Sequence, residues 1–344
     1  MYSNVYLINV IMKLGGNMAE IDKKIIEMLQ KGVTLQKIKL KFDLCDSDVV
    51  KRINALSNMG YSIGRSFNEY GVKFQVSDKI VMPLQDNINI TTSNKFTFLV
   101  IADTHFGNIY EDLELVNGLY QYAQDRNIRY VFHLGDIIEG CALDNQSPSR
   151  IKRADIHEQV DFVTKKYPKS DKVDTIYILG NHDYRCLSKG IDISKVIERR
   201  RLDMHFAGFK SSKIRVGDKL VLLQHPFTIE KSSIYDSEIR DLYFKPQFDL
   251  ILRGHTHHNG IYINEDESIV VNVPACYSSP SRKYQGAYEV EFFNDSVTLR
   301  SLILDSEPEV FSEIKYELKP KEKTKTLDSP IDKFNARYSK RNNA

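Results

Sequence analysis

Five short segments of this chain carry side chains that could bind two divalent metal ions. In order they are Asp103-Thr104-His105, Gly135-Asp136, Gly180-Asn181-His182-Asp183, His225 and Gly254-His255-Thr256-His257. Carboxylate, amide and imidazole groups bind divalent cations, and imidazole nitrogen favours Mn, Fe or Zn over Mg or Ca. Two such ions about 3.5–4 Å apart promote in-line attack of water on phosphorus. The residue types therefore predict a two-metal centre that hydrolyses phosphate esters.

Each of these segments directly follows a short apolar run. The runs cover residues 96–102, 130–134, 175–179, 220–223 and 248–252. Their length and composition are typical of buried strands that end at a turn. Open α/β sheets bind their ligands beyond the carboxyl ends of the strands. We therefore expect five strands to deliver the polar side chains to one edge of the fold.

Taken together and in this order, the five segments resemble the motif blocks of the calcineurin-like metallophosphoesterase superfamily, over roughly residues 95–305. The resemblance implies an α/β fold in which two mixed β-sheets pack face to face and are flanked by helices. It also implies two sets of metal ligands that share one bridging carboxylate. These sets are Asp103, His105, Asp136 and His257 for one ion, and Asp136, Asn181, His225 and His255 for the other.

The resemblance also implies roles for two residues that bind no metal. His182 matches the family histidine that protonates the leaving oxygen or stabilises charge on the phosphoryl group. Asp183 would orient His182. Glu139 stands where the family commonly has Asp, and we assign it no ligand role. Among metals, the ligand types favour manganese, with iron and zinc as alternatives.

Composition limits the class of protein. The chain has 344 residues, enough for two or three domains, and its net charge of only +2 gives no overall basic field. Its four cysteines are far apart in sequence, which favours free thiols in a reducing compartment. No apolar stretch is as long as a membrane span. We therefore expect a cytoplasmic protein that does not interact with membranes.

The N-terminal region has a different pattern. Apolar residues recur at helical spacing in 21–31, in 35–41 and in a third segment that Asp46 or Ser47 is expected to cap. Two strands, 61–63 and 72–76, then flank a turn at 68–71. Over residues 18–82 this order resembles a winged helix-turn-helix domain, which implies DNA as a partner. The DNA would be contacted by Lys51 and Arg52 of the third helix and by Arg65 of the wing.

Three further segments complete the predicted organisation. Residues 1–17 are an N-terminal extension, 83–94 are a polar linker, and 306–344 are a polar, basic tail that is expected to be mostly disordered over 319–344. Tyr184, Arg185 and Arg253 flank the motif residues and are candidates for substrate contact. The basic stretch 189–201 is either a path for a polyanionic substrate or a solvated helix face. The oligomeric state is left open, with a homodimer as one option.

The function divides by substrate. The leading hypothesis is a two-metal-dependent phosphoesterase that cuts phosphodiester bonds, as a DNA nuclease recruited by its winged helix. The alternative is a phosphodiesterase or phosphatase acting on a nucleotide, a cyclic nucleotide or a phosphoprotein, with a regulatory N-terminal domain. A third reading is a DNA-binding regulator with a vestigial phosphoesterase domain. An open basic groove beside the metals would favour a nuclease, whereas a closed pocket would favour a small substrate.

Overall fold

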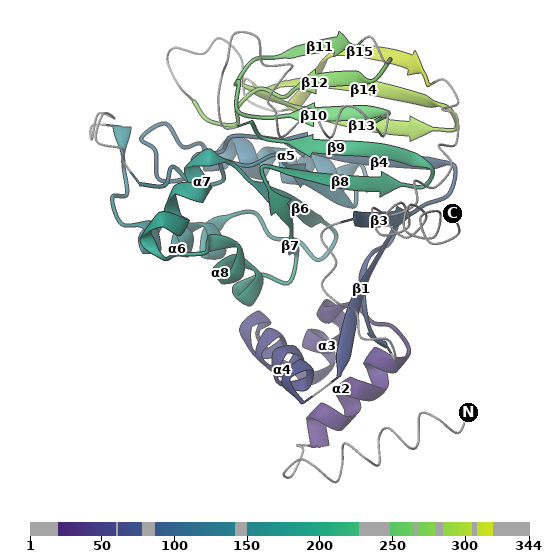
Figure 1. The fold of residues 1–344 in the computed structure, drawn as a ribbon, viewed down its shortest axis with the longest axis vertical. Coiled ribbons are helices and arrows are strands. Elements are labelled where there is room, and N and C mark those ends of the chain that lie inside the picture. The colour runs from purple at the N-terminus through teal and green to yellow at the C-terminus, as the bar shows by residue number, and fades with distance from the viewer. Residues whose placement is uncertain are drawn as a thin grey trace, which may run out of the picture.

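Two mixed β-sheets packed face to face form the body of the molecule (Figure 1). The structure is a computed structural model, and it describes residues 20–59, 61–77, 87–141, 150–226, 248–264, 267–278, 285–304 and 308–318. The pair of sheets agrees with the fold predicted from the motif blocks. Within these ranges, no helix is long and apolar enough to cross a membrane.

The seven-stranded sheet supplies three of the five motif-bearing strands. Its order is β15 (Pro308–Glu317), β14 (Ser296–Leu304), β13 (Gly286–Phe293), β4 (Lys95–Ile101), β5 (Tyr130–His133), β6 (Asp174–Leu179) and β7 (Met204–Phe209). Strands β4 to β7 are parallel, so their carboxyl ends lie at the same edge. The motif residues that follow β4, β5 and β6 are therefore brought together by the sheet itself.

The eight-stranded sheet supplies the other two motif-bearing strands. Its order is β11 (Gly260–Ile263), β12 (Ile269–Asn272), β10 (Leu250–Arg253), β9 (Lys219–Gln224), β8 (Ser211–Val216), β3 (Asn87–Thr91), β1 (Ser62–Asn68) and β2 (Gly71–Ser77). Strands β9 and β10 are parallel neighbours, with Leu222 opposite Ile251. The residues that follow them therefore meet at one edge of this sheet.

Strand β4 shows how the alternation of side chains builds two hydrophobic layers. Phe96, Phe98 and Val100 point into the core between the sheets. Leu99 and Ile101 point the other way, into a second core. That second core is covered by the helices α5 (Leu113–Asp125), α6 (Ile156–Lys166) and α8 (Ile193–Arg200).

Among the residues that the structure describes, helices cover the outer face of the seven-stranded sheet, as predicted. The outer face of the eight-stranded sheet carries a small cluster of Leu222, Phe248, Ile251 and Val270. Within the described parts of the chain, no helix contributes to this cluster. The helices between the parallel strands instead return across the seven-stranded sheet, because each one connects neighbouring strands of that sheet.

The N-terminal region contains three helices, α2 (Glu20–Gln30), α3 (Leu35–Phe42) and α4 (Asp46–Asn58), followed by the antiparallel pair β1 and β2. The helices bury their own apolar core, which includes Ile25, Ile38 and Leu56. Helix α4 begins at Asp46 with Cys45 as the residue before it. Asp46 is therefore not the cap that one reading of the sequence expected, and its carboxylate instead pairs with Lys39 and Lys169.

Two boundaries predicted from composition are wrong. Residues 87–91 lie inside the predicted linker 83–94 but form β3, which pairs in parallel with both β1 and β8 and buries Ile88 and Ile90. The N-terminal hairpin is thereby continuous with the eight-stranded sheet. Residues 308–317 lie inside the predicted tail but form β15, paired with β14. The predictions for 1–17 and for 319–344 lie outside the described residues.

Candidate metal centre

The motif residues converge where the two sheets meet. Asp103 follows β4, Asp136 follows β5, and Asn181 follows β6 in the seven-stranded sheet, while His225 and His255 follow β9 and β10 in the other. Each side chain is thus placed by the end of a buried strand. The five-strand convergence predicted from the sequence is present, and it draws on both sheets rather than on one.

The first group of candidate ligands consists of Asp103, His105 and His257. Their ligand atoms lie within 4.8 Å of one another. Asp103 Oδ1 is 3.2 Å from His257 Nε2 and 3.8 Å from His105 Nε2, and the two imidazole Nε2 atoms are 3.4 Å apart. Three ligand atoms so close, all turned to one point, could hold a single cation.

The second group consists of Asp136, His225 and His255, again with ligand atoms within 4.8 Å of one another. His225 Nε2 lies 3.3 Å from Asp136 Oδ2 and 3.1 Å from Asn181 Oδ1. Asn181 therefore adds an amide oxygen to this group. Asp136 Oδ2 also lies 3.7 Å from His105 Nε2 of the first group. Asp136 thus stands between the two groups, where a bridging ligand would be.

The chemistry of this cluster fits a pair of divalent ions. Asp103 Oδ1 is buried and has no hydrogen-bond partner, which is costly for a carboxylate oxygen unless a cation completes it. Asp103, Asp136 and His225 are almost completely buried. Imidazole and carboxylate ligands in a buried site suit Mn, Fe or Zn.

Most of these residues have an uncommon backbone conformation. Asp103, His105, Asp136, His255 and His257 all have positive φ, between 44° and 72°. This conformation costs about 1 kcal/mol or more for each residue that is not glycine. Hydrogen bonds hold it in place, with Asp103 N donating to Gly135 O and His105 N donating to Asp136 O, each at 3.0 Å. The strain indicates that the loops are shaped for the positions of their side chains.

Glycines allow the segments to approach one another. A Cβ at Gly180 would lie 2.2 Å from Asp136 Oδ1 and 2.7 Å from His225 Cε1. Gly135 has φ of +92°, and a Cβ there would lie 2.8 Å from His225 Nδ1. These two positions therefore require glycine for steric reasons, which explains why Gly precedes both Asp136 and Asn181.

Protonation within the cluster reflects its buried carboxylates. Burial lowers the pKa of His225, but Asp136 outweighs that effect and raises it to about 9. Burial also lowers the pKa of His105, but the nearby Glu139 outweighs this effect and raises the pKa to about 8. Burial lowers the pKa of His255 to about 4. Metal binding must displace the protons on His105 and His225, so affinity should rise with pH.

His182 lies beside the first group, on the short helix α7 (Asn181–Arg185). Its ring centroid is 4.6 Å from that of His105, and its backbone N donates to Asp136 Oδ1 at 2.8 Å. Its Nδ1 is 2.7 Å from the carbonyl oxygen of Glu139. Because Nδ1–H donates to that oxygen, Nε2 is the ring nitrogen left for a substrate.

Asp183 is placed differently from the prediction. Its carboxylate does not hold the His182 ring but accepts three backbone hydrogen bonds, from Ile137 N at 3.1 Å and from Ile138 N and Gly180 N at 3.0 Å. Burial and the nearby Asp136 raise its pKa to about 7, and the three donors oppose that rise. Asp183 therefore ties α7 to the loop after β5, and it positions His182 only through the backbone.

Glu139, which was assigned no ligand role from the sequence, contacts a ligand ring from behind, and Tyr277 was not predicted. Glu139 Oε2 lies 3.0 Å from His105 Nδ1, on the side of the ring away from the metal group, and accepts from Asn108 Nδ2 at 3.0 Å. The Tyr277 hydroxyl lies 3.4 Å from His257 Nδ1. Glu139 was detectable as an acid after a motif residue, whereas Tyr277 comes from a loop with no chemical signal in the sequence.

The predicted substrate contacts separate into two places. Near the metal groups, Tyr184 is 46% exposed, Arg185 Nη1 is 3.2 Å from His182 Nδ1, and Arg253 Nε donates to Gln224 Oε1. The other three lie in the N-terminal region and pair with carboxylates. These pairs are Lys51 with Asp48 at 3.8 Å, Arg52 with Asp22 at 2.6 Å and Arg65 with Glu198 at 3.2 Å.

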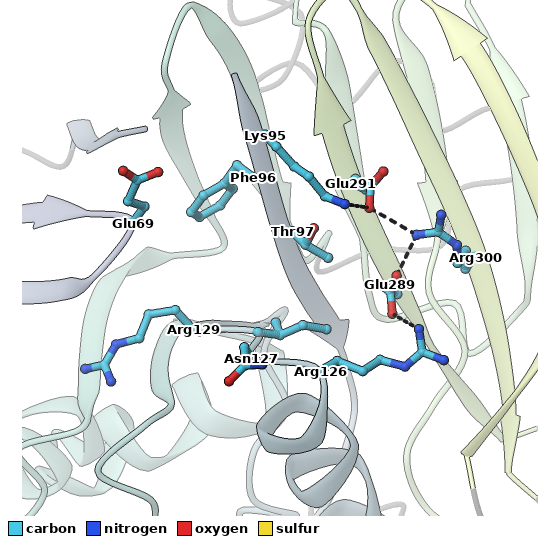
Figure 2. A pocket seen from close by; sticks show the side chains of 11 residues that line it. Glu69, Lys95, Phe96, Thr97, Arg126, Asn127, Arg129, Glu289, Glu291 and Arg300 are labelled. Atoms are coloured by element: carbon cyan, nitrogen blue, oxygen red, sulfur yellow. Dashed lines mark hydrogen bonds and ion pairs between the residues drawn. The ribbon is translucent and has the colours of Figure 1, made fainter. Parts of the chain in front are cut away.

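A hollow of about 600 Å³ lies at the other end of β4, away from Asp103 (Figure 2). Its charged side chains pair with each other. Arg300 lies between Glu289 and Glu291, at 2.6 and 3.5 Å, and Lys95 is 3.0 Å from Glu291. These pairs leave little unbalanced charge for a ligand, so the hollow is a structural ion-pair network.

Comparison with known proteins identifies the domain that holds this cluster. Residues 96–259 match the family model described as calcineurin-like phosphoesterase. No curated protein matches the chain. The matched segment spans all five motif blocks, and it is a calcineurin-like metallophosphoesterase domain with a metal-binding site of Asp and His residues.

Solved structures with related shape include a dimetal phosphatase from Danio rerio, at 11% identity and a TM-score of 0.41, with 65% of this chain and 99% of that chain covered. Vps29 from Entamoeba histolytica, solved with Zn²⁺, has 14% identity and a TM-score of 0.39, with 65% and 100% covered. A predicted phosphoesterase from Streptococcus pneumoniae has 15% identity and a TM-score of 0.38, with 65% and 99% covered. Such low values say nothing about the substrate of this chain.

Proposed function

We propose that this metal-dependent phosphoesterase cuts phosphodiester bonds in DNA, and that its N-terminal winged helix-turn-helix-like region, docked against α8, helps to form the surface that binds the DNA. The observation that carries the chemistry is the position of Asp136 between the two ligand groups. That position fits a shared ligand of two ions at the spacing used for phosphoryl chemistry.

The residues of the chain would act as follows. Bound at the two groups, divalent ions would neutralise the phosphate and lower the pKa of water. The Asp and His ligands set where the phosphate must lie. His182 Nε2 then faces that phosphate, because Nδ1 donates to Glu139 O. There it would donate to the leaving oxygen or stabilise charge on the phosphoryl group.

Support for DNA comes from the junction between helices α4 and α8, which lie next to each other (Figure 1). A hollow of about 550 Å³ opens between them. Asn54 and Ser57 of α4 line it on one side, and Lys195 and Arg199 of α8 on the other. Arg199 is exposed and has no ion-pair partner among the residues that the structure describes. Polar groups facing cations in this way suit a phosphate backbone.

The structure changes the expected mode of DNA contact. The third helix was expected to face DNA, but Asn54 of this helix lines the hollow beside α8. A recognition helix needs its whole outer face free to enter a major groove about 12 Å wide. We therefore propose that DNA contacts Arg199, together with the exposed Lys195, which pairs with Asp192 at the start of its own helix at 3.2 Å, while α4 stays docked. Arg52 and Arg65 instead pair with Asp22 and Glu198 from other segments.

The first experiment is a cleavage assay with Mn²⁺ on end-labelled single-stranded and duplex DNA. It runs beside bis-p-nitrophenyl phosphate, with Asp136→Asn as the control that removes the shared ligand. Cleavage of DNA by the wild type and not by the variant supports the proposal. Turnover of the chromogenic ester with intact DNA refutes the DNA part and favours a small phosphodiester as substrate.

Recruitment is tested with Lys195→Ala/Arg199→Ala, two exposed residues remote from the metal ligands. Each lost phosphate contact should reduce the slope of log affinity against log salt by about 0.9 for duplex DNA. Lys315→Ala, an exposed lysine on β15, is the matched control. An unchanged slope in the double variant would refute the role of α8. Manganese as the natural metal, a cytoplasmic location and a homodimer all stay predictions.

A further inference from the structure

Two large aromatic side chains beside the metal centre are exposed to solvent. Tyr184 is 46% exposed and Phe209 is 39% exposed. Their rings are in edge-to-face contact, with centroids 6.1 Å apart and an interplanar angle of 84°. We refer to this pair as the aromatic ledge. Rings of this size are usually covered, so an exposed pair beside a reactive centre requires an explanation.

Both residues of the ledge come from segments that carry the metal centre. Tyr184 lies on α7, within one helical turn of Asn181 and two residues after His182. Phe209 ends β7 and pairs with Leu179, the last residue of β6 before Gly180 and Asn181. The residue after Phe209 contacts the centre through its backbone, because His225 N donates to Lys210 O at 2.6 Å. The ledge is therefore continuous with the metal centre.

The aromatic ledge is also connected to the buried core by two further rings. Phe209 packs against Phe206, with centroids 5.0 Å apart, and Phe206 packs against Tyr177 at 5.7 Å. Tyr177 is completely buried in the core beneath the helices. A line of rings thus leads from the core to the surface, so the exposed rings are held in place before any ligand arrives. Such preorganisation reduces the entropy cost of binding.

We propose that the aromatic ledge stacks on an unpaired nucleobase of the nucleotide whose phosphate lies at the metal centre. Stacking on aromatic side chains is how proteins hold unpaired bases, and it accepts any base because every base has a π-face. Arg185, whose guanidinium is next to His182, adds positive charge where the sugar–phosphate chain would pass. The proposal deepens the proposed function by naming nucleotides, with unpaired bases, as the substrate class.

A consequence follows for the structure of the nucleic acid. In a duplex both faces of an internal base are covered by its neighbours, so the ledge can reach only terminal, frayed or single-stranded nucleotides. Taking a base out of the stack costs a few kcal/mol. We therefore expect single-stranded ends to be cut faster than internal duplex positions.

The test compares two p-nitrophenyl esters that differ only in the group beside the phosphate, the thymidine monophosphate ester and the methyl phosphate ester. The wild type should prefer the thymidine ester in kcat/KM. Tyr184→Ala and Phe209→Ala should each reduce that preference roughly 5- to 100-fold, the size expected from stacking on one base. Tyr184→Phe should keep the preference, because the ring is retained. Because the preference is a ratio of the two esters within each variant, a general loss of activity cancels from it.

The matched control is Phe293→Ala. Phe293 is 47% exposed but pairs with Lys95 at the end of the sheet away from the metal centre. Thermal unfolding of each variant should show that the fold is kept. A wild type that treats both esters alike, or ledge variants that behave like Phe293→Ala, would overturn the proposal.

This assay separates the ledge from the proposed function. If the preference for the thymidine ester depends on Tyr184 but DNA is not cut in the cleavage assay, the ledge proposal stands and DNA is refuted as the substrate. If the wild type cleaves DNA and the ledge variants cleave single-stranded DNA at the same rate, the nuclease proposal stands and the ledge proposal is refuted. An abasic residue beside the cleaved bond should slow the wild type on single strands and leave Tyr184→Ala unaffected.

Discussion

The carboxylate of Glu139 lies 3.0 Å from Nδ1 of His105, while Nε2 of the same ring faces Asp103 and Asp136. One side of the imidazole thus contacts a carboxylate and the other side faces the candidate metal position. A carboxylate in this position fixes the orientation of a ligand ring and raises its basicity. Burial alone would raise the pKa of Glu139, but His105 outweighs it and lowers the pKa.

Glu139→Gln should therefore weaken metal binding although it removes no ligand. Loss of such a partner commonly costs 10- to 100-fold in affinity. Titration calorimetry with Mn²⁺ should show the loss at one of two sites. Glu158→Gln, an exposed residue of α6, is the control and should bind as the wild type does. Equal affinity in both variants would mean that Glu139 does not support His105.

His182→Gln should separate catalysis from metal binding. The ring lies near His105 and Glu139 but is in neither of the two predicted ligand sets, so two-site Mn²⁺ binding should be retained. The turnover number should fall by roughly 100-fold or more, because a positioned acid at the leaving oxygen contributes this much. Steady-state kinetics on the chromogenic ester measures it. If kcat is unchanged, His182 acts neither as an acid nor as a stabiliser of charge.

Gly180→Ala should disrupt the metal centre by steric clash alone. The backbone at Gly180 suits any residue, but the new methyl group would lie 2.2 Å from Asp136 Oδ1 and 2.6 Å from Asp136 N. Overpacking of this kind costs about 1–3 kcal/mol and must displace Asp136. We expect a lower melting temperature and loss of Mn²⁺ binding.

Gly64→Ala is the matched control for that experiment. Gly64 lies in β1, and its nearest neighbour to a new Cβ is Gln75 O at 4.0 Å. This variant should unfold at or above the wild-type temperature, since alanine loses less entropy than glycine on folding. Similar losses in Gly64→Ala and Gly180→Ala would rule out a specific steric role for Gly180.

Asp46 gives the contact between the N-terminal helices and the phosphoesterase domain a dependence on pH. Burial raises the pKa of Asp46, but hydrogen bonds from Lys169 and Lys39 outweigh it and lower the pKa below the usual 3.8. A carboxyl group whose pKa is lower in the folded state than in the unfolded state stabilises the fold at pH values above its unfolded pKa. That stability is lost as the pH falls through the folded pKa.

We therefore expect Asp46→Asn to lower the free energy of unfolding by about 1–3 kcal/mol at neutral pH, the size of charged hydrogen bonds. The difference from the wild type should shrink once the pH falls below about 4. Urea unfolding across this range measures it. Asp48→Asn, which removes an exposed pair with Lys51, should show little effect at any pH. A difference that stays constant with pH would contradict the ionic origin of the contact.

The sequence alone determined the order of the motif blocks and the strands that carry them. Each apolar run is short, buried on both faces and followed at once by its polar residues, so periodicity and chemistry indicate the same boundary. The resemblance of these blocks to the metallophosphoesterase motifs then implied seven candidate ligands.

Only the tertiary structure decided which strands pair with one another and how the side chains around the motif residues are oriented. The short runs of β3 and β15 acquire partners only when distant strands meet, so their composition resembled a linker and a tail. Asp183 accepts backbone donors from a loop about 45 residues away, and Glu139 contacts His105 on the side of the ring away from the metal groups. The pairing of Tyr184 with Phe209 and the docking of α4 on α8 likewise depend on contacts between segments far apart in sequence. No local pattern records such contacts, because the free energy that selects them comes from packing between surfaces that exist only after folding.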